Sequence, residues 1–195
     1  MSKSDVIAAM RPVINLLEEL NIPYYIGGSI ASSSLGIARA TMDVDIITSI
    51  SLMHVERIVQ LLDENYYVDS EMIIDAIKHK STFNVIHHDT SYKIDFFISK
   101  TTEYQQSIFE RISRKKLVDK DDVIEVFICA PEDVILTKLI WYIARGGTSE
   151  KQWNDIVGVL KIQKNTLDMN YLLNWAEKLS VKSELENALT DAGVH

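Results

Sequence analysis

The chain has 195 residues, of which 47% are hydrophobic and 25% are charged, and its formal net charge is −8. These values are typical of a globular protein and exclude disordered, collagen-like and coiled-coil chains. An acidic chain is also not a general DNA- or RNA-coating protein, because phosphate binding requires a cationic field.

The first two-thirds of the sequence alternate between helical and strand patterns. Helices are predicted over residues 5–20, over a short segment that ends near Gly36, and over 52–65 and 71–79. Strands are predicted at 24–26, 43–48, 82–87, 92–99 and 124–129. Residues 82–87 and 92–99 read as an antiparallel pair. The basic residues between Arg111 and Lys120 are interrupted by acids, so a solvated turn is favoured there over an RNA-binding patch.

From Pro131 onward the pattern is helical, with helices predicted over 131–145, 149–163, 168–179 and 182–192. The predicted fold class is therefore α+β, a mixed β-sheet with flanking helices followed by a C-terminal helical region. We expect a core of residues 1–130 and a helical region of residues 131–195 that packs on it.

Compartment and membrane association follow from composition. The single cysteine, Cys129, excludes an intramolecular disulfide and fits a reducing compartment. Its apolar neighbours predict a buried structural thiol. No secretory signal or membrane-spanning stretch is evident, so we expect a soluble, cytoplasmic protein without a membrane partner.

Three carboxylates are candidates for metal chemistry. Asp43 and Asp45 lie two positions apart on a predicted strand, so both project from the same face. Two anions this close repel unless a proton, a basic side chain or a cation compensates them. Asp95 lies between apolar neighbours on another strand and is costly to keep without a partner. If the two strands are neighbours, the carboxylates converge and suit Mg²⁺ or Mn²⁺. For the aspartate pair alone, a solvated strand edge is the favoured interpretation.

A glycine turn precedes these acids. Gly27 and Gly28 lie between a predicted strand and a predicted helix, where they allow the backbone to approach a ligand closely. The start of a helix also presents free N–H groups to an anion such as phosphate. Ser29 would cap the helix, contact a phosphate, or do both. Taken alone, the glycines indicate only a tight turn.

Together these features resemble the DNA polymerase β-type nucleotidyltransferase superfamily. The resemblance lies in the run Gly27-Gly28-Ser29, the thirteen-residue gap before Asp43-Val44-Asp45-Ile46, and the later Ile94-Asp95-Phe96. Segments 36–41, 130–139 and 149–156 resemble a bacterial branch of that superfamily related to abortive-infection type IV toxins. The likeness spans residues 26–156.

The resemblance implies a metal-dependent enzyme that moves an NMP from an NTP to a hydroxyl acceptor and releases pyrophosphate. The acceptor would be a small molecule, a protein or a tRNA. Asp43 and Asp45 would hold two Mg²⁺ or Mn²⁺ ions, and Asp95 would complete the site and help to deprotonate the acceptor.

The same resemblance implies roles for residues that bind the nucleotide. Gly27, Gly28 and Ser29 would form the turn that cradles the β- and γ-phosphates. Arg39 or Lys138 would neutralise the triphosphate. Lys138 and Asp155 match positions that line the nucleotide pocket in related toxins.

Two other interpretations are compatible with the pattern. One is a catalytically silent nucleotide-binding module of a toxin–antitoxin or regulatory pair, which the presence of all three acids disfavours. The other is a glycosyltransferase that uses paired aspartates for a metal–nucleotide complex. The glycine turn and Asp95 argue against it.

Overall fold

The computed structural model describes residues 5–194 and divides into two compact units. The first, here called the sheet unit, comprises the described residues up to Gly27 and residues 41–128. The second, the helical unit, comprises residues 28–40 and the described residues from Cys129 onward. Residues 28–40 therefore group with the C-terminal helices, which the sequence did not indicate. A domain boundary near residue 130 stays a prediction.

The sheet unit is built on one seven-stranded mixed sheet in the order β3-β4-β5-β2-β1-β7-β6. Its strands are β1 (Tyr24–Ile26), β2 (Asp43–Thr48), β3 (Tyr66–Tyr67), β4 (Thr82–His87), β5 (Lys93–Ile98), β6 (Ser113–Asp119) and β7 (Asp122–Ile128). The pairs β2–β5 and β1–β7 are parallel, and the other neighbours are antiparallel. The predicted antiparallel pairing of 82–87 with 92–99 is confirmed as β4–β5.

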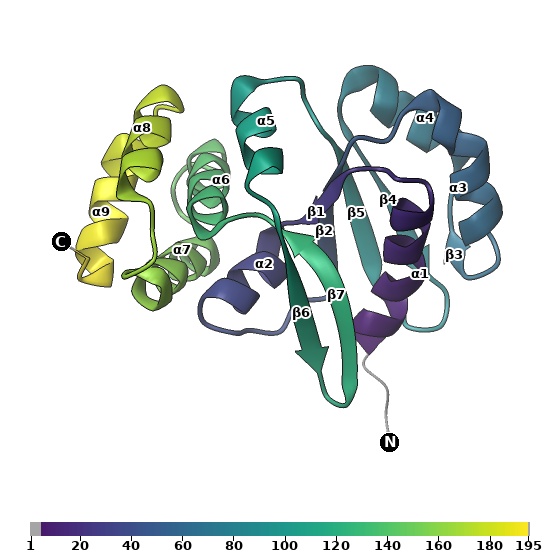
Figure 1. Cartoon of the computed structure of the whole chain (residues 1–195), viewed down its shortest axis with the longest axis horizontal. Helices are drawn as coiled ribbons and strands as arrows, with labels where there is room; N and C mark the ends of the chain where they lie inside the picture. Colours follow the sequence, from purple (N-terminus) through teal and green to yellow (C-terminus); the bar gives the residue numbers. More distant parts are fainter. Residues whose placement is uncertain (1–4, 195) are drawn as a thin grey trace. The chain divides into compact units, whose positions relative to one another are not determined.

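Helices of the sheet unit bury one face of this sheet (Figure 1). They are α1 (Asp5–Glu19), α3 (Val55–Leu62) and α4 (Ser70–His79), with the 3₁₀ helix η1 (Leu52–His54) before α3. The unit also contains α5 (Glu103–Glu110). α1 contacts β7, α4 contacts β4, and α3 contacts both α1 and α4. α1 turns an apolar stripe inward, as the spacing predicts, with Met10, Val13 and Leu17 buried. Apolar residues alternate along the strands beneath these helices, so Val44, Ile46 and Ile94 are fully buried.

α5 lies on the opposite face of the sheet, over β1. The Phe109 ring contacts the Tyr25 ring edge-on at a centroid distance of 5.3 Å, and Gln105 Nε2 donates to Tyr25 Oη at 2.8 Å. The segment that supplies this helix carries a weak apolar pattern, and the sequence analysis did not predict it.

The interpretation of the basic segment as a solvated turn is wrong. Residues 113–119 form β6, the edge strand of a hairpin with β7 that extends beyond the other strands (Figure 1). Because β6 is paired on one side only and Ser113 to Lys116 are all exposed, it carries no apolar alternation from which to predict a strand. The short β3 was missed too, and the predicted helix over 52–65 is divided into η1 and α3.

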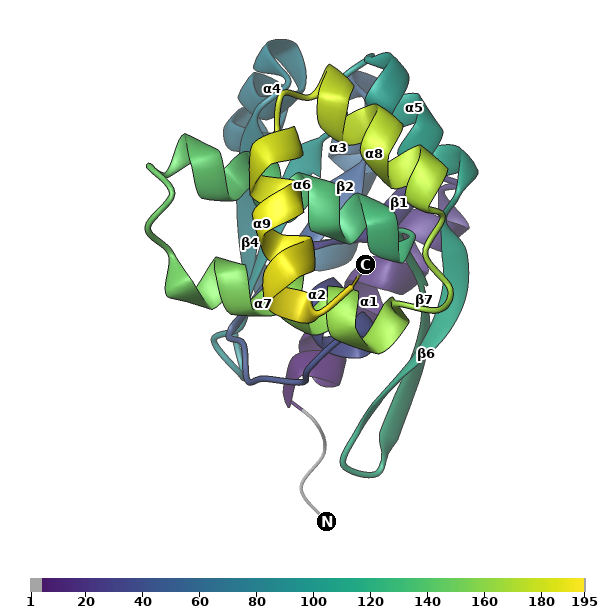
Figure 2. The same ribbon diagram turned by 90° about the vertical axis from the view of Figure 1, so that its left-hand side faces the viewer.

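The helical unit contains α2 (Gly28–Leu35), α6 (Pro131–Ala144), α7 (Glu150–Gln163), α8 (Met169–Lys178) and α9 (Lys182–Ala192). The four C-terminal helices lie within two residues of their predicted bounds, and α8 and α9 are in the foreground of Figure 2. Buried acids at the start of α6 join it to α8. Asp133 accepts from Tyr171 Oη at 2.7 Å, and Glu132 accepts from the backbone N–H of Asp168 at 2.6 Å.

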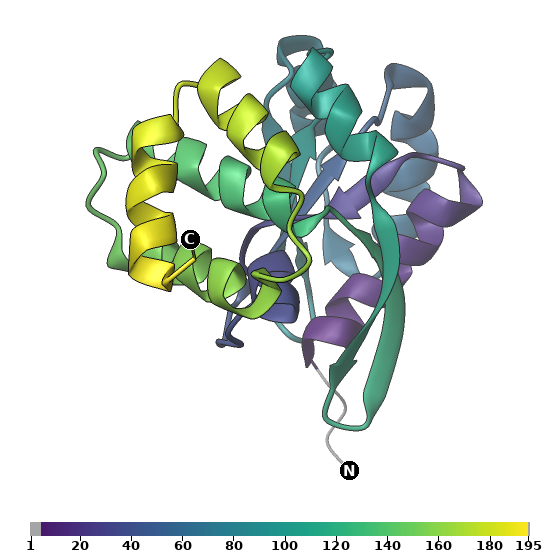
Figure 3. The ribbon, with the colours of Figure 1, turned by 60° about the vertical axis from the view of Figure 1, so that its left-hand side comes forward.

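α2 and α7 approach each other closely, and both are visible side by side in Figure 3. At Gly36, just after α2, a Cβ atom would lie 2.8 Å from the backbone nitrogen of Val159 and 2.9 Å from the carbonyl carbon of Gly158. No side chain fits there without moving backbone. Gln163 Nε2 also donates to the carbonyl of Leu35 at 2.7 Å. These contacts hold residues 28–40 against α7.

Cys129 is buried, as predicted. Burial, reinforced by the nearby charge of Asp133, raises the pKa of its thiol, so it is not a reactive group at neutral pH. Among residues 5–194 no helix combines the length and apolar character needed to cross a membrane.

Candidate functional site

The three predicted carboxylates lie on one face of the sheet unit. β2 and β5 are adjacent and parallel, and their register pairs Asp45 with Asp95 and Asp43 with Lys93. Paired positions in neighbouring strands project from the same face. The expectation that the two strands are neighbours is therefore confirmed, and we call Asp43, Asp45, Asp95 and Lys93 the acidic face.

Alternation along the two strands explains why these side chains avoid the core. Val44 and Ile46 bury their side chains against the helices, so Asp43 and Asp45 must project from the other side. The Asp43 side chain is 57% exposed, whereas that of Asp95 is 19% exposed. Asp95, which the sequence identified as costly to keep without a partner, is thus more enclosed than Asp43.

Lys93 supplies that partner. Its Nζ lies 2.8 Å from Asp95 Oδ2 and 3.7 Å from Asp43 Oδ1. The hydrogen bond with Asp95 raises the pKa of Lys93 above its ordinary value, so the side chain is charged at neutral pH. No role for Lys93 was predicted from the sequence, although its position two residues before Asp95 places both side chains on one face. Within the described chain, no group of three or more His, Cys, Asp or Glu residues is arranged to hold a metal ion.

The acidic face continues onto β4 and β3 through residues that the sequence analysis did not single out. Asn84 pairs with Asp95, Ile86 pairs with Lys93, and Tyr67 pairs with Ile86. Tyr67 is 55% exposed and Ile86 is 37% exposed. A polar amide and two exposed apolar side chains therefore lie beside the carboxylates on the same side of the sheet.

Gly27 and Gly28, at the start of α2, are each explained by local backbone geometry. The backbone N–H of Gly27 donates to the carbonyl of Asp45 at 2.9 Å, and a Cβ at Gly27 would lie 2.7 Å from Ile47 Cδ1. Gly28 has a φ of 54°, a conformation that glycine adopts without steric cost. α2 begins at Gly28, so Ser29 lies in its first turn and not at the predicted capping position.

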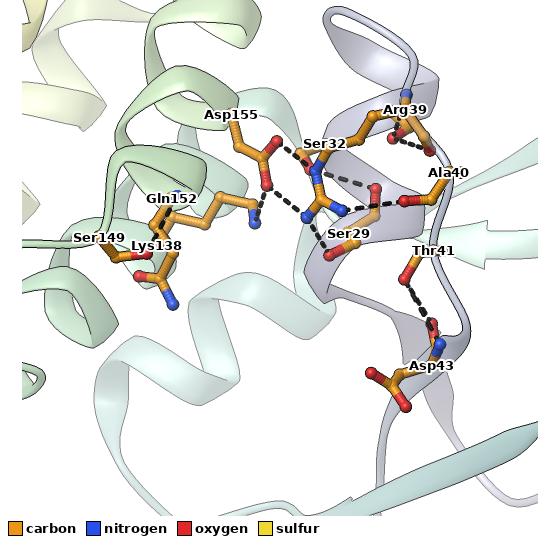
Figure 4. A network of polar contacts seen from close by, with 11 residues as sticks. Ser29, Ser32, Arg39, Ala40, Thr41, Asp43, Lys138, Ser149, Gln152 and Asp155 are labelled. Carbon is orange, nitrogen blue, oxygen red and sulfur yellow. Dashed lines mark hydrogen bonds and ion pairs between the residues drawn. The ribbon is translucent and has the colours of Figure 1, made fainter.

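In the helical unit, four of the predicted residues form one polar cluster (Figure 4). Asp155 on α7 accepts from Arg39 Nε at 2.8 Å and from Arg39 Nη2 at 2.9 Å. Its Oδ2 also accepts from Lys138 Nζ of α6 at 2.9 Å. Arg39 Nη2 donates further to Ser29 Oγ on α2. We call Ser29, Arg39, Lys138 and Asp155 the cationic cluster.

Two cations share one carboxylate in this cluster, so its summed charge is positive. Asp155 and Lys138 are both buried, and the Arg39 side chain is 23% exposed. Burial alone would raise the pKa of Asp155. Hydrogen bonds and charge from Arg39 and Lys138 outweigh this effect and hold the pKa below its ordinary value. The excess positive charge and the donors of Arg39 are suited to binding an anion.

Solved structures of similar fold come from nucleotidyltransferase-like proteins. An antigenic nucleotidyltransferase-like protein from Paracoccidioides brasiliensis is 16% identical with a TM-score of 0.55, and the match covers 97% of this chain and 94% of that one. ANT(2″)-Ia, in a complex with adenylyl-2″-tobramycin, is 14% identical with a TM-score of 0.55, covering 93% of this chain and 99% of the other. A solution structure of the antibiotic-resistance factor ANT(2″)-Ia is 12% identical, with a TM-score of 0.51 and coverages of 95% and 93%.

These similarities confirm the predicted fold class, a nucleotidyltransferase-like mixed sheet with flanking helices. At such identities the likeness is one of fold. No protein-family model matches the sequence, and no curated protein matches it significantly.

Proposed function

We propose that this protein is a metal-dependent nucleotidyltransferase, which moves an NMP from an NTP to a hydroxyl acceptor with release of pyrophosphate. One observation carries the proposal. Asp43, Asp45 and Asp95 lie on one face of two adjacent strands, in a chain with a nucleotidyltransferase-like fold. The silent nucleotide-binding module is the less favoured alternative, because a module without chemistry has no need of three clustered carboxylates.

The donor chemistry of the acidic face fits a hard divalent cation. Aspartate oxygens are the ligands that Mg²⁺ and Mn²⁺ prefer. Lys93 pairs with Asp95 and Asp43, so a cation is accommodated beside both carboxylates. Asp43 and Asp45 would hold two metal ions, and Asp95 would complete the ligand set. When bound, such ions stabilise charge on the attacking and leaving oxygens of an in-line displacement.

The residues of the sheet unit would have separate roles in the reaction. Asp95, which is less exposed than Asp43, would accept the proton of the acceptor hydroxyl as that oxygen attacks the α-phosphate. Asn84, Ile86 and Tyr67 would contact the body of the acceptor, since they extend the acidic face toward the sheet edge. The acceptor that we propose is a hydroxyl of a small molecule, a protein or a tRNA.

The role that we propose for the cationic cluster is to bind phosphate oxygens. Arg39 and Lys138 would supply charge, and Ser29 with the backbone of Gly28 would supply further hydrogen bonds at the start of α2. Asp155 would hold both cations in position, because it contacts each of them. Pyrophosphate, as the product, would be retained by the same groups.

Transfer is tested with each of the four NTPs labelled at the α-phosphate, in Mg²⁺ or Mn²⁺, with fractions of a bacterial lysate as acceptors. The key variant is Asp43→Asn, which removes a charge and leaves the volume of the side chain unchanged. The matched control is Asp121→Asn, which changes an exposed carboxylate in the β6–β7 turn. We expect label in an RNA, protein or small-molecule fraction with the wild type and the control, and none with Asp43→Asn.

Thermal unfolding of Asp43→Asn distinguishes a catalytic role of Asp43 from a structural one. Its melting temperature should stay the same or rise, since removing one of three clustered negative charges relieves repulsion. A large loss of stability would instead indicate a structural role for Asp43. Absence of transfer together with absence of metal-dependent NTP binding by calorimetry would contradict the enzyme and favour the silent module.

The resemblance to abortive-infection toxins adds a cellular expectation to this proposal. Expression of the intact chain should slow bacterial growth, whereas expression of Asp43→Asn at the same level should not. Equal growth of the two strains, with transfer activity present in vitro, would contradict the resemblance to toxins and leave the proposed enzymatic activity intact.

A further inference from the structure

The ion pairs of Lys93 have a consequence for how the proposed metal ions are bound. Lys93 is paired in register with Asp43 and lies two residues before Asp95 on the same strand. Its ammonium group contacts both carboxylates, at 3.7 Å and 2.8 Å. Any divalent cation that binds these two oxygens must displace Lys93 or share them with it.

We infer that Lys93 is an internal counter-cation that competes with metal for Asp43 and Asp95, so that the acidic face binds metal tightly only together with a nucleotide. The inference rests on the proposed function, because it assumes that these carboxylates are metal ligands.

Exposure of the lysine allows the exchange to occur. The Lys93 side chain is 41% exposed, so its ammonium group can leave the carboxylates for solvent without first being unburied. Asp43 is more exposed still. The ion pair that the metal must break is partly exposed, so its cost to metal affinity is that of such a pair.

Charge explains why a nucleotide would reverse the balance. Asp43, Asp45, Asp95 and Lys93 together carry two negative charges, and without Lys93 they would carry three. A metal ion that binds alone must displace the lysine from the oxygens of Asp43 and Asp95, and the displaced ammonium then loses both contacts. A triphosphate adds anionic oxygens that a displaced Lys93 can pair with, so the lysine loses little when the metal and the nucleotide bind together. Metal and nucleotide then enhance each other's binding, and this coupling is reciprocal.

The test measures Mn²⁺ binding by the loss of the free-ion electron paramagnetic resonance signal, with and without an α,β-methylene NTP analogue. Lys93→Met removes the charge and keeps a flexible apolar stem. The control Lys116→Met removes an exposed lysine paired with Glu125 at 3.7 Å on the β6–β7 hairpin. We expect Lys93→Met to bind Mn²⁺ alone roughly 2- to 5-fold more tightly than the wild type. The analogue should enhance its Mn²⁺ binding less than it does in the wild type.

Lys93→Arg keeps the positive charge and should restore weak binding of Mn²⁺ alone. If Lys93→Met does not fold by circular dichroism, Lys93→Gln gives the same comparison. Asp43-dependent Mn²⁺ binding that is equal in Lys93→Met, Lys116→Met and the wild type would overturn the inference and leave the proposed function intact. Absence of Asp43-dependent Mn²⁺ binding in every variant, even with the analogue, would overturn both.

Discussion

The substitution Asp155→Asn tests the cationic cluster most directly. It removes the carboxylate that contacts both Arg39 and Lys138, and it leaves two positive charges in a largely buried setting. Breaking a buried ion pair by removing one partner typically costs about 3–5 kcal/mol. Because Arg39 retains some access to solvent, we expect the lower end, about 3 kcal/mol.

The expected loss is large enough to follow by thermal unfolding. For a chain of this size a change of 1 kcal/mol shifts the melting temperature by about 2–4 °C, so Asp155→Asn should melt about 6–12 °C lower at neutral pH. The control is Glu19→Gln, which breaks an exposed ion pair with Arg57 and should cost no more than about 1 kcal/mol. Equal melting temperatures for Asp155→Asn and Glu19→Gln would refute the reasoning.

The pH dependence of stability provides a second, independent test of the ion pairs of Asp155. The pKa of Asp155 is lower in the folded chain than its ordinary value of 3.8. Its contribution to stability is therefore present above about pH 4 and is lost as the pH falls through the folded pKa. The difference in melting temperature between the wild type and Asp155→Asn should become smaller only in that acidic range. Added pyrophosphate should stabilise the variant more than the wild type, because the anion replaces the negative charge that Asp155 supplies to Arg39 and Lys138.

Two further substitutions test packing and the phosphate-binding role. Gly36→Ala should lower the free energy of unfolding by about 1–3 kcal/mol, measured by urea denaturation, because its Cβ would clash with the backbone of Val159 and Gly158. Gly158→Ala is the matched control and should cost less, since its Cβ would meet Ile37 at 3.4 Å. Ser29→Ala should weaken NTP binding by calorimetry more than NMP binding, because Ser29 is expected to contact the β- and γ-phosphates. Equal weakening would argue against that contact.

Periodicity predicted most of the fold because most elements have one buried face. β2 and β5 alternate between polar and apolar residues over 43–46 and 93–96, so both strands and the side that carries Asp43, Asp45 and Asp95 followed from the sequence. The elements that were missed lack such a face. β6 is an exposed edge strand, and α5 buries little more than Ile108 and one aromatic contact.

The sequence predicted site residues that belong to short motifs. It did not predict contacts that depend on how separate elements are aligned in the fold. Asp155 and Lys138 were selected by resemblance alone, and only the structure shows that they share a hydrogen bond with each other. Lys93 was visible beside Asp95 in the sequence, but its contact with Asp43 follows from the alignment of β2 with β5. The pattern of one strand does not specify how it aligns with another strand, so this contact could not be predicted from the sequence.

The grouping of residues 28–40 with the C-terminal helices has a consequence for how the chain is made. α2 is synthesised early, yet the helix against which Gly36 and Leu35 pack is α7, which leaves the ribosome more than a hundred residues later. The helical unit therefore cannot complete its core during synthesis of the sheet. A ribosome-bound chain that ends before α7 should leave residues 28–40 accessible to proteases, and the finished chain should protect them.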